Sequence, residues 1–195
     1  MERGVLFFGP VGSGKTQAIR SVSEIAVVDT DVQATDETQQ IKPQTTVAMD
    51  IGTVHLGERD KLRLYGAPGQ SRFDFMWDIL LQQSHAVVLL LNHRNPKPIA
   101  DLAFYVDALE ARLAGRTVPL VVGVTHVDEA PDTSIEPYQC WLSQHPLRFF
   151  DGNAPVLRLD ARSAAHLRML LITVTALLEM EERYPREAAT PSLKR

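Results

Sequence analysis

The 195-residue sequence has one cysteine, no excess of positive charge and no long apolar run. Its one cysteine, Cys140, has no second cysteine with which to form an internal disulfide, which favours a reducing cytoplasm. With 20 Lys and Arg against 24 Asp and Glu, the net charge is −4, so the basic surface expected of a nucleic-acid-binding protein is absent. The longest uninterrupted apolar run, Ala86–Leu91, is far shorter than the roughly 20 residues that span a bilayer. We therefore expect a cytoplasmic protein that binds no nucleic acid.

Motifs for targeting, lipid attachment and zinc binding are absent as well. Glu2 follows the initiator Met, where N-myristoylation requires glycine, and no cysteine near the C-terminus offers a prenylation site. The six histidines are scattered without the spacing of zinc ligands. We expect no signal peptide and no direct membrane anchor, one domain over residues 1–184, and a flexible polar tail over residues 185–195.

Apolar segments alternate with helical patterns along most of the chain. The turn at residues 57–60 joins two alternating strands, which predicts that these two strands are antiparallel. Strands that alternate with helices predict a mostly parallel six-stranded sheet with helices on both faces, whose ligands bind at the carboxyl ends of the strands. The predicted strands cover residues 5–8, 46–56, 61–65, 86–91, 119–124 and 155–159, and the predicted helices cover 14–26, 71–83, 99–114, 133–144 and 164–184.

A loop suited to phosphate follows the first predicted strand. Residues 9–16, GPVGSGKT, spell G-x-x-x-x-G-K-[ST], a loop whose backbone N–H groups point into one concavity at the start of a helix. Lys15 is expected to bridge β- and γ-phosphate charge, and the Thr16 hydroxyl to ligate Mg²⁺. The alternative is a glycine-rich turn that binds no ligand. The residues assigned to nucleotide binding here are Gly12, Ser13, Gly14, Lys15, Thr16 and Gln17.

Residues 62–73, LRLYGAPGQSRF, resemble the switch II segment of the Ras superfamily, W-D-T-A-G-Q-E-R-F. Gly69, Gln70, Arg72 and Phe73 match that pattern in place. The resemblance implies that the Gly69 N–H contacts the γ-phosphate and that Gln70 orients the attacking water. The alternative is an ordinary turn into a helix, in which Trp77 is a helix-face contact.

A departure from that pattern narrows the resemblance. Gly66 stands where the superfamily has an aspartate that holds the Mg²⁺ shell through water. Together with Pro68, this loss resembles the bacterial small GTPases of the gliding-motility MglA type, which tend to carry Pro-Gly-Gln without the aspartate. The resemblance runs from Val5 to about Glu182 and implies a three-layer P-loop NTPase (Ras-like) α/β fold. It also implies GTP and GDP as ligands, Mg²⁺ as cofactor, a roadblock (MglB-like) partner that activates hydrolysis, and an effector of unknown identity.

A polar segment rich in Asp, Thr and Gln, residues 29–46, precedes the second predicted strand, and its length favours a functional loop. Residues 45–50, TTVAMD, align with the switch I pattern T-I-G-x-D-F. On that register Thr46 closes onto Mg²⁺ and the γ-phosphate. The alternative is that both threonines only favour the start of a strand.

The segment after the fifth predicted strand bears on the choice of base. It reads THVD where the family has N-K-x-D, so that Thr125 and His126 replace Asn and Lys. The Asp128 carboxylate suits both N1–H and the exocyclic amine of guanine, whereas adenine offers no matching pair of donors. Ala161 falls where the family places an alanine N–H against guanine O6. The alternative for Asp128 is a helix N-cap in an ordinary loop.

These motifs favour a GTP-binding molecular switch that cycles between GTP and GDP states to regulate a partner protein. The catalytic residues would be Gln70, Lys15 and Gly69. Residues 29–46 contain no arginine, and their only cation is Lys42, so hydrolysis is expected to be slow without a partner.

Two other functions fit parts of the sequence. An ATP-dependent small-molecule kinase would need a lid with arginines and an acceptor pocket, which the sequence does not obviously provide. A nucleotide-binding scaffold that never hydrolyses remains open because of the departures at Gly66, Thr125 and His126.

Overall fold

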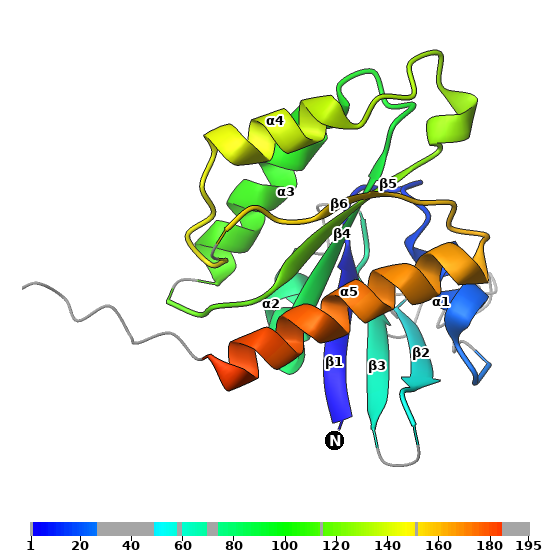
Figure 1. Ribbon diagram of the computed structural model, residues 1–195, viewed down its shortest axis with the longest axis vertical. Helices are drawn as coiled ribbons and strands as arrows, with labels where there is room; N and C mark the ends of the chain where they lie inside the picture. Colours follow the sequence, from blue (N-terminus) through cyan, green and yellow to red (C-terminus); the bar gives the residue numbers. More distant parts are fainter. Residues whose placement is uncertain are drawn as a thin grey trace, which may run out of the picture.

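Six strands alternate with five α-helices in the part of the chain that the computed structural model describes, residues 2–26, 49–57, 60–69, 74–113, 115–150 and 152–184 (Figure 1). The predicted tail and the predicted site residues Thr46 and Gln70 lie outside these ranges. The strands are β1 Glu2–Phe8, β2 Asp50–His55, β3 Lys61–Gly66, β4 Ala86–Asn92, β5 Leu120–Thr125 and β6 Val156–Arg158. The helices are α1 Lys15–Val22, α2 Phe75–Gln83, α3 Pro98–Arg112, α4 Glu136–Gln144 and α5 Ala164–Arg183, with a short 3₁₀ turn, η2, at Val127–Glu129.

The six strands form one sheet in the order β2-β3-β1-β4-β5-β6. Only the β2–β3 pair is antiparallel, and the other neighbouring strands are parallel, which confirms the predicted mostly parallel six-stranded sheet. The carboxyl ends of the five parallel strands therefore share one edge of the sheet. The antiparallel register places Asp50, at the start of β2, opposite Gly66, at the end of β3.

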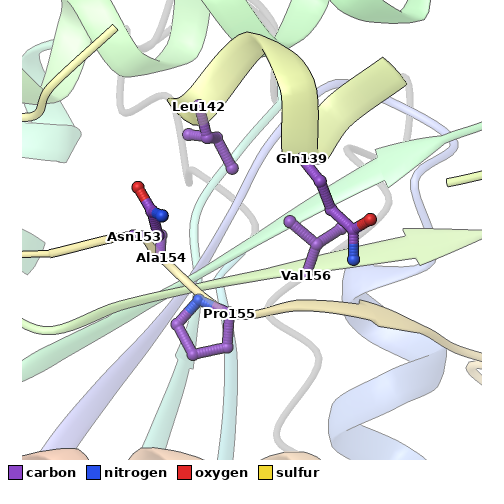
Figure 2. A pocket seen from close by; sticks show the side chains of 6 residues that line it. All are labelled: Gln139, Leu142, Asn153, Ala154, Pro155 and Val156. Atoms are coloured by element: carbon purple, nitrogen blue, oxygen red, sulfur yellow. The ribbon is translucent and has the colours of Figure 1, made fainter. Parts of the chain in front are cut away.

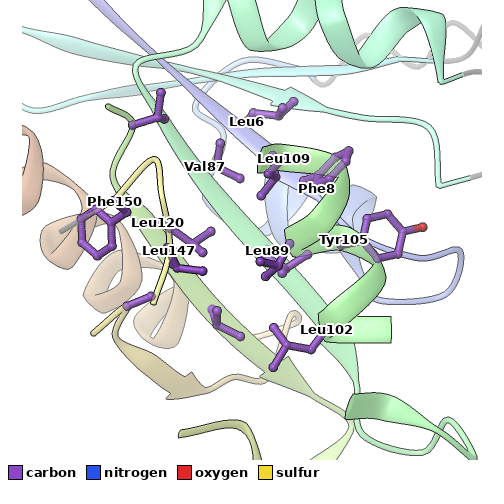
Figure 3. Packing of buried hydrophobic residues seen from close by; sticks show 14 of the residues in the cluster. Leu6, Phe8, Val87, Leu89, Leu102, Tyr105, Leu109, Leu120, Leu147 and Phe150 are labelled. Atoms are coloured by element: carbon purple, nitrogen blue, oxygen red, sulfur yellow. The ribbon is translucent and has the colours of Figure 1, made fainter. Parts of the chain in front are cut away.

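Helices cover both faces of the sheet, as the alternation of strands and helices predicted. Apolar residues of α1 and α5 pack on one face, and those of α2, α3 and α4 pack on the other. Successive side chains of a strand point to opposite faces, so the apolar run of β4 supplies Val88 and Leu90 to one core. It supplies Val87 and Leu89 to the other core, which Figure 3 shows. Each core excludes water from one side of the same sheet.

Two predicted helices are shorter than the sequence pattern indicated. Helix α1 ends at Val22 and not at residue 26, because Ser23 is extended and the Glu24 N–H donates to the Thr53 carbonyl of β2. Helix α4 begins at Glu136 and not at residue 133, since the Ser134 hydroxyl accepts from the Glu136 N–H in a turn before the helix. Across the described ranges, no helix combines the length and apolarity needed to cross a membrane.

Candidate functional site

Loops from four parallel strands meet at the carboxyl edge of the sheet and carry most of the predicted site residues. The loop after β1, residues 9–16, lies between the strand and α1. Gly9 has a φ of 134°, and a Cβ added there would lie 2.1 Å from the Leu90 carbonyl oxygen, so this position requires glycine. Gly14 precedes α1 with a φ of 88°, a left-handed conformation that starts the helix in place.

Lys15 is the one buried lysine of the described chain, with a residue exposure of 8%. Its Nζ donates to the Gly9 carbonyl at 2.8 Å and to the Pro10 carbonyl at 2.7 Å, and lies 3.4 Å from Ser13 Oγ. Burial lowers the pKa of Lys15 to about 8, while the negative charge of Asp50 opposes that shift. An ammonium has three donors, and the bond to Ser13 Oγ is the longest of the three, so that N–H is the one that an anionic ligand would take.

Thr16 and Asp50 form a polar pair that the sequence reasoning did not assign. The Thr16 hydroxyl donates to Asp50 Oδ2 at 2.5 Å. A Cβ added at Gly66 would lie 3.0 Å from both Asp50 Cβ and Asp50 Oδ2. The Asp50 side chain therefore occupies the space into which a side chain at residue 66 would project. The predicted antiparallel pairing of the two strands could have indicated this pair, because it places Asp50, the last residue of TTVAMD, near Gly66.

The structure brings Gly69 against the 9–16 loop. A Cβ added at Gly69 would lie 2.6 Å from the Val11 backbone nitrogen and 3.0 Å from Lys15 Nζ, so only glycine permits this approach. Two of the three predicted catalytic residues, Lys15 and Gly69, are thus adjacent. Gln70 lies outside the described residues, as does Thr46, which was predicted to ligate the metal.

The ends of β4 and β5 hold the 9–16 loop from the other side. The buried Thr125 hydroxyl lies 3.1 Å from the Ser13 and Leu91 carbonyl oxygens, either of which it can donate to. The Asn92 amide donates to the Gly12 carbonyl at 3.2 Å, a contact that the sequence reasoning missed. Thr125 therefore braces the 9–16 loop from the end of β5.

Ala161 and Gln17 differ in how they relate to this loop. The Ala161 Cβ lies 3.0 Å from the position of a Cβ added at Gly14, so the loop after β6 touches the start of α1. The Ala161 carbonyl also accepts from Ser21 of α1 at 2.7 Å. The exposed Gln17 instead directs its amide to Ser21, one turn along the same helix. The structure thus brings Ala161 beside the loop, whereas the hydrogen bond of the Gln17 side chain runs along its own helix.

Asp128 lies in the η2 turn that follows β5. His126 precedes this turn with a φ of 58°, and its Nδ1 lies 3.2 Å from the Thr125 hydroxyl. Asp128 pairs with Arg162 Nη2 at 3.3 Å, and Arg162 Nε binds Asp160 Oδ1 at 2.8 Å. Asp128 lies within the η2 turn, and no described helix uses its side chain as an N-cap.

A pocket of about 310 Å³ lies elsewhere, between α4 and the segment that leads into β6 (Figure 2). It has no charged group among its lining side chains, so it does not suit a phosphate. Within the described ranges, no group of three or more His, Cys, Asp or Glu side chains is placed to hold a metal ion. The lining residues are Gln139, Leu142, Asn153, Ala154, Pro155 and Val156.

Comparison with known proteins gives weak similarity. No family model matches the chain. The intraflagellar transport protein 22 homologs of Rattus norvegicus and Mus musculus are each 24% identical to it over 101 residues. The match covers 52% of this chain and 52% of each relative, so the chain spans about half the length of the curated relatives that it matches.

Proposed function

We propose that the chain is a GTP-binding molecular switch of the P-loop NTPase (Ras-like) fold, which hydrolyses GTP slowly and uses Mg²⁺. The observation that carries this proposal is the position of Lys15, buried under the 9–16 loop at the carboxyl edge of a parallel sheet. The N–H that Lys15 directs to Ser13 Oγ, together with the adjacent Gly69, fits the β- and γ-phosphates of a nucleotide. The names of the two relatives state no ligand, so the proposal rests on this geometry.

Thr16 and Asp50 supply oxygen atoms that fit Mg²⁺. This ion prefers oxygen ligands, keeps several waters, and binds through few protein groups together with substrate phosphates. The Thr16 hydroxyl can continue to donate its hydrogen bond to Asp50 Oδ2 while one of its oxygen lone pairs binds the ion. Asp50 would hold a metal-bound water in place of the aspartate that is missing at Gly66. Bound there, Mg²⁺ would neutralise charge on the phosphates during hydrolysis.

Asp128, Ala161, Thr125 and His126 form the proposed guanine site. The two oxygens of Asp128 match the two adjacent donors of guanine, and a carboxylate has enough acceptor sites to keep Arg162 as well. Ala161 touches Gly14, which brings the base loop next to the phosphate loop. Thr125 supports the 9–16 loop. The His126 ring lies beside Thr125 and would cover the base.

Hydrolysis and switching require two residues outside the described ranges. Gln70 directly follows Gly69 and would orient the attacking water, and Thr46 would close onto the metal ion. Loss of the γ-phosphate would release the segments that contain these residues, which changes the surface offered to an effector. We propose a roadblock (MglB-like) partner that activates hydrolysis.

Nucleotide identity is the most direct test of this proposal. The nucleotide that co-purifies with the protein should be GDP or GTP, and stripped protein should bind GDP at least tenfold more tightly than ADP in Mg²⁺. Multi-turnover assays with GTP and ATP then separate the alternatives. Equal affinities for both bases would favour the kinase, and tight GTP binding without turnover would favour the scaffold.

A further inference from the structure

Two buried aromatic side chains hold the carbonyl groups on either side of the Gly69 α-carbon. The Trp77 indole Nε1 of α2 donates to the Pro68 carbonyl at 3.0 Å. The Tyr105 hydroxyl of α3 donates to the Gly69 carbonyl at 3.2 Å. Glycine has the greatest backbone freedom of any residue, so two such bonds at consecutive carbonyls fix a segment that would otherwise be variable.

The two donors are themselves held firmly in the core. Trp77 is 2% exposed and Tyr105 is 5% exposed, and their rings meet the Phe8 ring edge to face with centroids 4.8 and 5.1 Å away. The Arg112 guanidinium lies over the Trp77 ring at 5.0 Å. Figure 3 shows the Tyr105 ring beside Phe8, with its hydroxyl pointing out of the packed group. Burial raises the pKa of Tyr105 to about 12, so the hydroxyl keeps its proton at neutral pH.

The bond from Trp77 also sets the direction of the Gly69 N–H. The carbonyl of Pro68 and the N–H of Gly69 belong to one planar trans peptide unit, in which they point in opposite directions. A carbonyl turned toward Trp77 therefore turns the Gly69 N–H away from α2. The α-carbon of the same glycine packs against Val11 and Lys15, where the proposed function places the phosphates.

We infer that Trp77 and Tyr105 are positioning residues that hold the Gly69 amide ready for a γ-phosphate and so determine the preference for guanosine triphosphate over diphosphate. This inference rests on the proposed function. Neither side chain has to touch the nucleotide. A diphosphate lacks the group that Gly69 would contact, so its affinity should not depend on either bond.

The test compares Tyr105→Phe with Tyr138→Phe. Tyr138 is a matched control, because it is fully buried, burial raises its pKa to about 12, and its hydroxyl bonds His93 Nδ1 at 2.8 Å, away from Gly69. Both variants lose one buried hydroxyl. Dissociation constants for GDP and for the slowly hydrolysed analogue GTPγS are measured in Mg²⁺ by displacement of a fluorescent guanine nucleotide, and melting temperatures are measured alongside.

Tyr105→Phe should bind GTPγS about two- to tenfold more weakly than the wild type, the range expected for one hydrogen bond, with GDP affinity unchanged. Tyr138→Phe should leave the ratio of the two affinities at the wild-type value. The inference would be overturned if the ratio of GTPγS affinity to GDP affinity were the same in both variants. It would also be overturned if Tyr105→Phe bound GTPγS more tightly, relative to GDP, than the wild type does. If the wild-type protein showed no preference for guanine nucleotides over adenine nucleotides, the proposed function itself would be rejected.

A second pair of variants tests the indole. Trp77→Phe keeps an aromatic ring but removes the donor to Pro68, and it should reduce GTPγS affinity without reducing GDP affinity. Trp141→Phe is its control, because Trp141 of α4 stacks on His145, the residue after that helix, with centroids 4.1 Å apart, and lies outside this segment. If Trp77→Phe weakens both nucleotides equally, its role is structural, and the inference fails for Trp77.

Discussion

At the residue scale, Asp50 places a carboxylate beside a glycine of the neighbouring strand. Gly66 offers no side chain, but its partner in the antiparallel register places a carboxylate in the same space and within 2.5 Å of the Thr16 hydroxyl. A Cβ at residue 66 would lie 3.0 Å from the Asp50 side chain, so a side chain there would require Asp50 to shift. An acidic group therefore lies beside the proposed phosphate site although residue 66 is glycine, and on the proposed function it would take the place of the aspartate of the switch II pattern.

Replacing Asp50 by Asn should uncouple nucleotide binding from Mg²⁺. The carboxamide can still accept from Thr16, but it lacks the charge that would hold a metal-bound water. We expect GDP affinity in Mg²⁺ to fall about tenfold or more, close to the affinity that the wild type shows in EDTA. Glu24→Gln is the control, since Glu24 binds His55 at the far end of β2. The double variant Asp50→Gly, Gly66→Asp should recover part of the Mg²⁺ dependence. If Mg²⁺ raised the GDP affinity of Asp50→Asn as much as that of the wild type, Asp50 would not hold a metal-bound water.

Replacing Lys15 by Ala should abolish nucleotide binding and leave the fold intact. Lys15 is the buried cation of the 9–16 loop, whereas Gly9, Gly14 and the helix after them define the loop without it. Isothermal titration with GDP should show at least a hundredfold loss of affinity, and circular dichroism should match the wild type. Lys61→Ala, an exposed cation bound to Glu2, should change neither measurement. Wild-type affinity in Lys15→Ala would reject the phosphate-loop assignment.

At the element scale, the sequence predicts the strands well because the buried strands consist of continuous apolar residues. The apolar run Ala86–Leu91 identifies a central strand, and GPVGSGKT identifies the loop before α1. Helix ends were predicted less well, since Ser23 and Glu24 leave α1 for contacts with β2, which is distant in the sequence. The role of Asp50 and the bonds of Trp77 and Tyr105 to the Gly69 segment also arise only when separate elements come together.

Replacing Asp128 by Asn should change the preferred base. Xanthine carries a carbonyl where guanine has its exocyclic amine, and an amide can donate to that carbonyl. We expect GDP affinity to fall at least tenfold and XDP affinity to rise, as measured by competition against a fluorescent nucleotide. Glu129→Gln, in the same η2 turn but paired with Arg94, is the control and should preserve the guanine preference. A variant with unchanged preference would place the base elsewhere.

At the scale of the whole molecule, topology collects groups that lie far apart in the chain. Parallel strands deliver the loops after β1, β3, β5 and β6 to one edge of the sheet, so Lys15, Gly69, Asp128 and Ala161 share one end of the molecule. The two described arginines in the loops at this edge are both paired with carboxylates, Arg94 with Glu129 and Arg162 with Asp128 and Asp160. Since a carboxylate already engages each described arginine of these loops, we expect the arginine that would stabilise the transferring phosphoryl group to come from outside them.

The isolated protein should consequently be a poor GTPase. An arginine contributed in cis or in trans accelerates phosphoryl transfer by about 10³- to 10⁵-fold, and an unassisted switch turns over at roughly 10⁻⁴ to 10⁻³ s⁻¹. We expect a rate in this range from phosphate release under multi-turnover conditions, and a still lower rate for Gln70→Leu with GTP binding retained. Lys42→Ala is the informative companion, because Lys42 is the only cation among residues 29–46. A wild-type rate near 1 s⁻¹ that falls sharply in Lys42→Ala would show that the chain supplies its own catalytic cation and needs no partner for it.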